Sequence, residues 1–210
     1  MIGVVDYEAG NISSVSNALS KVGAPFIVSN DAGELSKCSG IILPGVGAAP
    51  GAMQSLRELN LVEFLRTSEV PLLGICLGMQ LLYEASEEGD TRCLGVVPGV
   101  IGSLNGRAET VPHMGWNRVR FFKESPVATD LLQEEYFYFA HSYVANVGPS
   151  TIAIADCGVE FTAVLGKDRV YGVQFHPEKS GSAGLRLMQN FTSLCSSFRP
   201  STSAKGSASD

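Results

Sequence analysis

The sequence predicts an α/β protein with an open, largely parallel central sheet flanked by helices, and with an additional antiparallel strand region in its second half. In the first half, short apolar runs of β type alternate with longer stretches of helical period, as in chains with buried parallel strands. In the second half, strand-like runs follow one another with little helix between them. The chain has 210 residues, 45% of them hydrophobic, which is enough to bury a large core in one domain.

The elements of the first half follow in a regular order. The run IGVV at 2–5 is the first strand, and a helix follows it that starts near Asn11 or Ser13 and stops at Gly23. PFIVS (25–29), GIILPG (40–45) and PLLGI (71–75) are further strands, and the last of these precedes a helix that begins near Leu77. The apolar positions that mark helical faces are Ile12, Val15, Leu19 and Val22 in the first helix, and Met53, Leu56 and Leu59 in another.

The second half changes character. WNRVRFF (116–122), EYFYFAHSYVA (135–145) and TIAIADC (151–157) are strand-like, and 161–175 is typical of a hairpin that turns at Lys167 and Asp168. A last helix carries Leu185, Met188, Phe191 and Leu194 on one face. The polar, Ser-rich segment 199–210 has no apolar period and is predicted to be a disordered tail, so one domain is expected over 1–198.

Charge and cysteine content exclude several classes of function. The formal net charge is −6, without long runs of one sign, so neither a nucleic-acid footprint nor a polybasic membrane anchor is expected. The first residues do not resemble a signal peptide, and no stretch approaches the roughly 18 apolar residues that span a bilayer. Five separated cysteines without a C-x-x-C pair argue against a disulfide framework or a thiolate zinc site. We therefore expect a cytoplasmic protein without a bound metal or cofactor.

One cysteine lies between two glycines where a strand meets a helix. Gly74-Ile75-Cys76-Leu77-Gly78 has the Gly-x-nucleophile-x-Gly spacing of a strand-to-helix elbow. There the start of the helix favours a thiolate, and the backbone N–H of Leu77 is placed to meet an oxyanion. The alternative, a small buried hydrophobic side chain, is adopted for the other four cysteines, Cys38, Cys93, Cys157 and Cys195.

A cysteine nucleophile needs a base, and the chain has three histidines. His176 follows a strand, and Glu178, two residues on, is close enough to orient its imidazole, so these two residues are the candidate base and orienting acid. His141 lies inside an aromatic strand and is expected to be a satisfied core histidine. The sequence leaves the role of His113 open.

A glycine-containing loop, LPGVGAAPG, follows the strand that ends near residue 43. Gly45 and Gly47, on either side of Val46, allow backbone N–H groups to turn toward an anion and supply a second oxyanion donor. The loop matches neither a phosphate-binding P-loop nor a dinucleotide fingerprint.

Five segments together resemble a known family. PGVG (44–47), GICLGMQ (74–80), PHMGWN (112–117), YFAHSY (138–143) and QFHPEKSG (174–181) are similar to class I (triad-type) glutamine amidotransferases, and most closely to the glutaminase subunits of imidazole glycerol phosphate synthase. The resemblance runs from Met1 to about Phe198. Glu8, where the family usually has glycine, and AAPG (48–51) depart from the pattern on the expected partner-facing edge.

The resemblance implies roles for individual residues. Cys76 is implied as nucleophile, His176 as general base and then acid, and Glu178 as its orienter. The implied glutamine contacts are Gly45, Val46, Gly47, Leu77, Gln80, Ser142 and Tyr143, although the residues alone favour a solvated helix position for Gln80. The implied contact face for a cyclase partner consists of Asn11, Trp116, Asn117, Tyr138 and Lys179, with plain core packing as the alternative for Trp116.

The same resemblance implies the reaction. Glutamine is hydrolysed to glutamate, and the ammonia passes to a (β/α)₈-barrel cyclase subunit that forms imidazole glycerol phosphate and AICAR in histidine biosynthesis. One alternative is a class I glutaminase that feeds anthranilate, guanylate or pyridoxal phosphate synthesis. A second is a free-standing cysteine hydrolase or redox sensor built on a related elbow.

Overall fold

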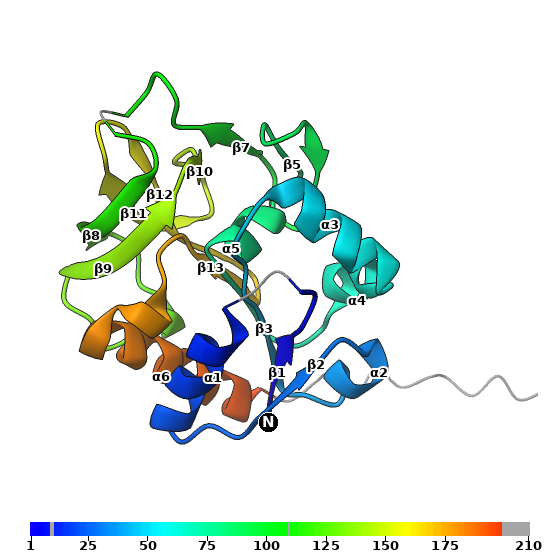
Figure 1. The fold of residues 1–210 in the computed structure, drawn as a ribbon. Coiled ribbons are helices and arrows are strands. Elements are labelled where there is room, and N and C mark those ends of the chain that lie inside the picture. Colours follow the sequence, from blue (N-terminus) through cyan, green and yellow to red (C-terminus); the bar gives the residue numbers. More distant parts are fainter. Residues whose placement is uncertain (9–10, 109, 199–210) are drawn as a thin grey trace, which may run out of the picture.

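The computed structural model describes residues 1–8, 11–108 and 110–198, and a nine-stranded sheet dominates it (Figure 1). The strand order is β2-β1-β3-β4-β13-β12-β11-β8-β9. The mutually parallel strands are β1 (Ile2–Val5), β2 (Phe26–Ser29), β3 (Gly40–Leu43), β4 (Leu72–Ile75) and β13 (Val170–Val173). The antiparallel strands are β12 (Glu160–Lys167), β11 (Thr151–Asp156), β8 (His113–Phe121) and β9 (Glu134–His141). The predicted fold class, a parallel core with an antiparallel second half, is confirmed.

A second, smaller sheet has the order β10-β7-β5-β6. Its strands are β5 (Ala85–Ser86), β6 (Thr91–Arg92), β7 (Val100–Ser103) and β10 (Tyr143–Ala145). The sequence did not predict it as a separate sheet, because strands this short do not show an alternating pattern. It matters for the site because β10 follows β9 directly and lies at the same edge of the molecule as helix α5.

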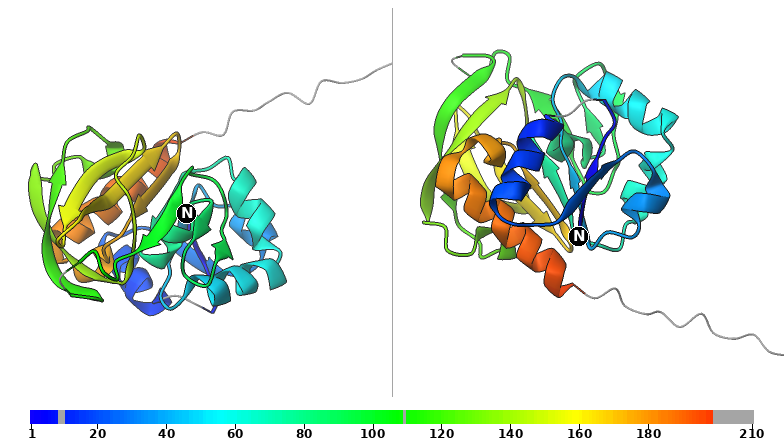
Figure 2. Two further views of the ribbon diagram at one scale, coloured as in Figure 1. Left: turned by 90° about the horizontal axis from the view of Figure 1, so that it is seen from above. Right: turned by 60° about the horizontal axis from the view of Figure 1, so that its bottom comes forward.

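Helices cover both faces of the large sheet (Figure 2). Helices α1 (Ile12–Lys21) and α6 (Gly181–Ser197) share one apolar cluster with Phe137 and Phe175. The opposite cluster contains side chains from α2 (Ala32–Leu35), α3 (Ala49–Glu58), α4 (Leu61–Thr67) and α5 (Leu77–Leu81). Two short 3₁₀ turns, η1 (Pro126–Ala128) and η2 (Pro177–Lys179), complete the elements. Between the two clusters lie the interior strands β4 and β13, whose carboxyl ends lead to the candidate site.

Several predicted boundaries shift by one or two residues. The hairpin between β12 and β13 turns at Asp168 and Arg169 rather than at Lys167 and Asp168, because Lys167 already pairs with Val170. The buried face of α6 is also displaced: Leu187, Met188 and Phe191 are fully buried, whereas Leu185 and Leu194 are only partly buried. Asn11 occupies the cap position of α1, as predicted.

The two departures from the family pattern differ in their local backbone. Glu8 has a φ of 66°, in the left-handed region that favours glycine, and AAPG forms the start of α3 with a proline in its first turn. The predicted tail, 199–210, lies outside the described residues. All five cysteines are free. Within the described part of the chain, no helix has the length and apolar character needed to cross a membrane.

Candidate active site

The predicted elbow is present between β4 and α5. Cys76 has a φ of 52° and a ψ of −110°, a backbone conformation that residues other than glycine rarely adopt. A Cβ on Gly78 would overlap the carbonyl oxygen of Leu43, and one on Gly74 would lie 2.7 Å from the backbone of Gly78. Both glycines are therefore required, because the elbow packs backbone against backbone.

The candidate base lies beside the nucleophile because their strands are neighbours. Strands β4 and β13 pair in parallel with Ile75 opposite Val173, so the segment after β13 ends next to Cys76. The ring of Phe175 stacks on Phe137 of β9 with centroids 3.9 Å apart. The backbone N–H of His176 donates to the Tyr138 carbonyl at 2.9 Å. The stacking of Phe175 and this backbone hydrogen bond together fix the backbone at His176 and so the position of its imidazole.

Two of the three predicted triad side chains are hydrogen-bonded, and Cys76 lies in the same cavity as His176. His176 Nδ1 lies 2.8 Å from Glu178 Oε1, and their side chains are 3% and 1% exposed. Because the carboxylate accepts from Nδ1, Nε2 is the ring nitrogen left for the reaction, and Cys76 and His176 line the same cavity. Burial by itself lowers the pKa of His176. Hydrogen bonds with Cys76 and Glu178 and the charges of both groups outweigh burial and raise that pKa to about 9. This shift favours a protonated imidazole near neutral pH.

A cavity of about 330 Å³ opens above Cys76. Its lining includes six of the residues implied as glutamine contacts: Val46, Gly47, Leu77, Gln80, Ser142 and Tyr143. Gly45 does not line it but packs beneath, where a Cβ would meet Leu77 and the hydroxyl of Tyr7. The Tyr7 hydroxyl donates to the Pro44 carbonyl at 2.6 Å, which holds the glycine loop against the sheet.

Gln80 is buried, so the solvated helix position favoured by the residues alone is wrong. Its side-chain nitrogen donates to the Tyr143 carbonyl at 2.9 Å and to Gln174 Oε1 at 3.0 Å. Gln174 is fully buried, and its own nitrogen lies 3.8 Å from Cys76 Sγ. Helix α5 therefore faces polar groups from Gln174, directly after β13, and from Tyr143, the first residue of β10.

The residues implied as a partner face separate into two groups. Trp116 is 58% exposed, which excludes plain core packing. It meets Tyr138 edge to face at 6.3 Å, and Lys179 Nζ lies 5.8 Å above the Tyr138 ring. Asn11 starts α1, which packs against the η2 turn that carries Lys179. Asn117, by contrast, uses its side chain on internal partners, because adjacent residues of a strand point to opposite faces.

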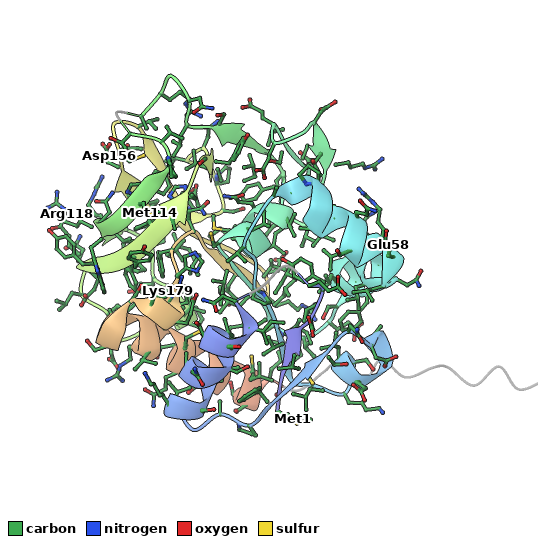
Figure 3. The ribbon with its side chains drawn as sticks, in the orientation of Figure 1. Met1, Glu58, Met114, Arg118, Asp156 and Lys179 are labelled. Carbon is green, nitrogen blue, oxygen red and sulfur yellow. The ribbon has the colours of Figure 1, made fainter. Side chains whose placement is uncertain are left out.

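The two remaining histidines are neighbours across β8 and β9. His141 is buried and hydrogen-bonded, as predicted for a core histidine, and it also lines the cavity. His113, whose role the sequence left open, lies opposite His141 in the strand register, with 2.9 Å between His113 Nδ1 and His141 Nε2. In Figure 3, Met114 of β8 and Lys179 lie on the viewed face, and both line the cavity.

Sequence reasoning missed several cavity or site residues, among them Glu88, Met114 and Gln174. Glu88 lines the cavity and accepts from the Ala49 N–H at 2.7 Å, but it lies in an acidic segment typical of a solvated loop. Met114 lies in the PHMGWN segment, but nothing in that segment marked its side chain as a cavity residue. Gln174 was detectable in principle, because an amide inside the apolar run VYGVQF needs a buried partner. Among the described residues, no cluster of three or more His, Cys, Asp or Glu side chains is arranged to hold a metal ion.

Comparison with known proteins agrees with this geometry. The family model for glutamine amidotransferase class-I matches residues 3–194. The chain is 47% identical to imidazole glycerol phosphate synthase subunit HisH 2 of Legionella pneumophila strain Paris, over 92% of this chain and 98% of the relative. It is also 47% identical to the HisH subunit of Geobacillus thermodenitrificans, over 92% and 96%. Among solved structures, one described as a glutamine amidotransferase matches with a TM-score of 0.73 at 18% identity, over 93% of this chain and 98% of that one. PurLQS from Thermotoga maritima matches with a TM-score of 0.69 at 19% identity, over 91% and 97%.

The chain therefore belongs to the class-I glutamine amidotransferase family. Within that family it belongs with the HisH subunits of imidazole glycerol phosphate synthase.

Proposed function

We propose that this chain hydrolyses glutamine to glutamate and delivers the ammonia to a cyclase subunit of (β/α)₈-barrel type. In this proposal the pair of subunits forms imidazole glycerol phosphate and AICAR in histidine biosynthesis, in the cytoplasm. The observation that carries the proposal is the position of Cys76: it lies at a strained elbow and shares a cavity of about 330 Å³ with His176, which is hydrogen-bonded to Glu178.

The first half of the reaction forms a thioester. The Cys76 thiolate attacks the side-chain carboxamide carbon of glutamine, and the electrons of the C=O bond move to oxygen. Backbone N–H groups of Leu77 and of the Gly45–Gly47 loop stabilise this oxyanion. As the tetrahedral intermediate collapses, protonated His176 gives its proton to the leaving nitrogen, and ammonia departs.

The second half releases glutamate. Neutral His176 takes a proton from water, and the resulting hydroxide attacks the thioester carbon. Collapse of this intermediate breaks the C–S bond and regenerates the thiolate beside imidazolium. Glu178 keeps Nδ1 of His176 as a donor throughout, so that Nε2 alone exchanges protons with the reacting groups. Glu88 offers a carboxylate in the same cavity and is suited to the substrate's ammonium group.

The mouth of the cavity is suited to a protein partner. Met114, 64% exposed, lines the cavity, and Trp116 continues the apolar surface along the same face of β8. Lys179 adds a positive charge at the same place. Ammonia released into neutral water becomes ammonium, a poor nucleophile, so a partner seated over this mouth is needed to receive it. Aromatic side chains rimmed by charge are typical of interface anchors.

The deciding experiment is a glutaminase assay with and without the cyclase. Cys76→Ala should abolish glutamine hydrolysis, whereas Cys157→Ala, which changes a half-buried free thiol, should leave it nearly intact. Trp116→Ala should reduce the activation by the partner about tenfold or more while changing the basal rate little. Leu132→Ala is the matched control, because Leu132 is 67% exposed at the opposite end of the β8–β9 pair. Equal hydrolysis rates with and without the cyclase would instead indicate a free-standing hydrolase.

A further inference from the structure

A chain of side-chain hydrogen bonds runs beside the cavity and takes no part in the triad. Asn117 Nδ2 lies 3.1 Å from His113 Nε2, and His113 Nδ1 lies 2.9 Å from His141 Nε2. His141 Nδ1 in turn lies 3.0 Å from the Tyr143 carbonyl oxygen. The chain therefore connects the middle of β8, through the ends of β8 and β9, to the first residue of β10.

Backbone groups fix the direction of this chain at the Asn117 end. Asn117 Nδ2 donates to the Asp156 carbonyl at 2.7 Å, and Asn117 Oδ1 accepts from the Arg118 N–H at 2.7 Å. If the Asn117 amide were rotated by 180°, Oδ1 would face the Asp156 carbonyl oxygen and Nδ2 would face the Arg118 N–H, so neither hydrogen bond could form. Asn117 must therefore present an N–H to His113 Nε2, which can only accept.

The other end gives the same direction independently. The Tyr143 carbonyl can only accept, so His141 Nδ1 carries a proton. Because His113 Nε2 accepts, a hydrogen bond between the rings needs a proton on His113 Nδ1 and a lone pair on His141 Nε2. Both rings are then neutral and both are Nδ1–H tautomers. Burial, together with the nearby His113, lowers the pKa of His141 to about 3, and burial also lowers the pKa of His113, in agreement with two neutral rings.

The Tyr143 carbonyl at the end of this chain also orients the side-chain amide of Gln80. It accepts from Gln80 Nε2, whose second N–H donates to Gln174 Oε1. Both N–H groups of Gln80 are thus engaged, and among the described residues no donor reaches its Oε1. Gln80 lines the cavity. What it can offer a ligand there is a hydrogen-bond acceptor, which suits an NH₂ or NH₃⁺ group of the substrate.

We propose that His113 and His141 are positioning residues for the glutaminase reaction. Both rings are neutral Nδ1–H tautomers, and in every hydrogen bond from Asn117 to the Tyr143 carbonyl the donor lies on the Asn117 side. This carbonyl holds the Gln80 amide with its oxygen available to the substrate. The inference rests on the proposed function for the identity of the substrate, but the direction of the chain stands on the hydrogen-bond partners alone.

The direction is tested by nitrogen NMR of the full chain, which has only three histidines to assign. Between pH 6 and 8 we expect two neutral Nδ1–H rings, His113 and His141, and one imidazolium, His176. In Asn117→Ala, the loss of the fixed donor should allow an Nε2–H form of His113, whereas Arg118→Ala, on the opposite face of the same strand, should change nothing. An Nε2–H tautomer or an imidazolium at either ring of the unmodified chain would overturn the proposal.

The positioning role is tested by steady-state kinetics. His141→Phe should raise KM for glutamine about tenfold, the cost of one misplaced buried hydrogen bond, with a smaller change in kcat. His141→Asn keeps an N–H close to the Nδ1 position and should recover most of this loss. Alkylation of Cys76 by iodoacetamide should stay within about twofold in both variants.

Equal KM values in all forms would refute the positioning role, and so would an alkylation rate that falls as far as kcat/KM. If His141→Phe does not fold, Asn117→Ala carries the same kinetic comparison. A chain with both Nδ1–H signals but no glutaminase activity would refute the proposed function and support the direction of the chain.

Discussion

In the proposed mechanism, the protonation of His176 is the residue-level property on which the reaction depends most. Burial alone would lower its pKa, but Cys76 and Glu178 raise it from 6.5 to about 9. Because the leaving nitrogen takes a proton from this imidazolium, kcat/KM for glutamine should fall as pH rises through about 9. Glu178→Gln removes one of the groups that raise the pKa, so its remaining activity should be lower by orders of magnitude and should fall at a lower pH.

The measurement is kcat/KM between pH 6 and 10 for both forms. A decline at the same pH in both would refute the contribution of Glu178. The sign for stability follows from the same shift, because the folded chain holds this proton more tightly than the unfolded chain. The stabilisation from His176 is complete below about pH 6.5 and is lost as pH rises through about 9, which denaturant midpoints at pH 6 and 10 would show.

Single residues also show what the sequence can and cannot predict. Cys76, His176 and Glu178 were predicted because the signals are local: two flanking glycines, and an acid two residues from a base. The burial of Gln80 was not predictable from α5, because its partners, Tyr143 and Gln174, lie 63 and 94 residues away. The partner of His113 depends in the same way on the β8–β9 register.

At the scale of elements, the elbow is the most constrained part of the molecule. Gly78→Ala places a methyl group on the backbone of β3 and should cost about 3 kcal/mol or more. Gly51→Ala is the matched control, because Gly51 lies in α3 with open space around it. That change should stabilise the fold by about 0.5–1 kcal/mol. Urea midpoints of the two variants should therefore move in opposite directions, and an unchanged midpoint for Gly78→Ala would contradict the tight packing.

Long, strongly patterned elements were predicted well, and short ones were not. Apolar runs such as IGVV and GIIL correspond to β1 and β3, because strands buried on both faces are continuously apolar. The two-residue strands β5 and β6 carry no such pattern. The one-residue errors at the β12–β13 turn and on the α6 face arise because tertiary contacts, not local period, set the last pairing and the buried stripe.

At the scale of the whole molecule, making ammonia and using it should be separable. Cys76→Ala mixed with the cyclase should fail with glutamine, yet the pair should form product when ammonium salt is supplied at high pH, because the acceptor step does not need the thiol. Cys157→Ala should support both reactions at nearly the unmodified rate. Product formation by Cys76→Ala from glutamine would contradict the thioester route.

The central position of β13 has a consequence for the time at which activity arises during synthesis. This strand lies between β4 and β12 and pairs with β4, Val170 opposite Leu72, so the sheet stays in two parts until nearly the whole chain has been made. At about 5–20 residues per second, the ribosome completes the base roughly 5–20 s after the nucleophile. A nascent chain therefore carries Cys76 without His176, and under the proposed mechanism it should not consume glutamine before β8 and β9, the proposed partner face, have also emerged.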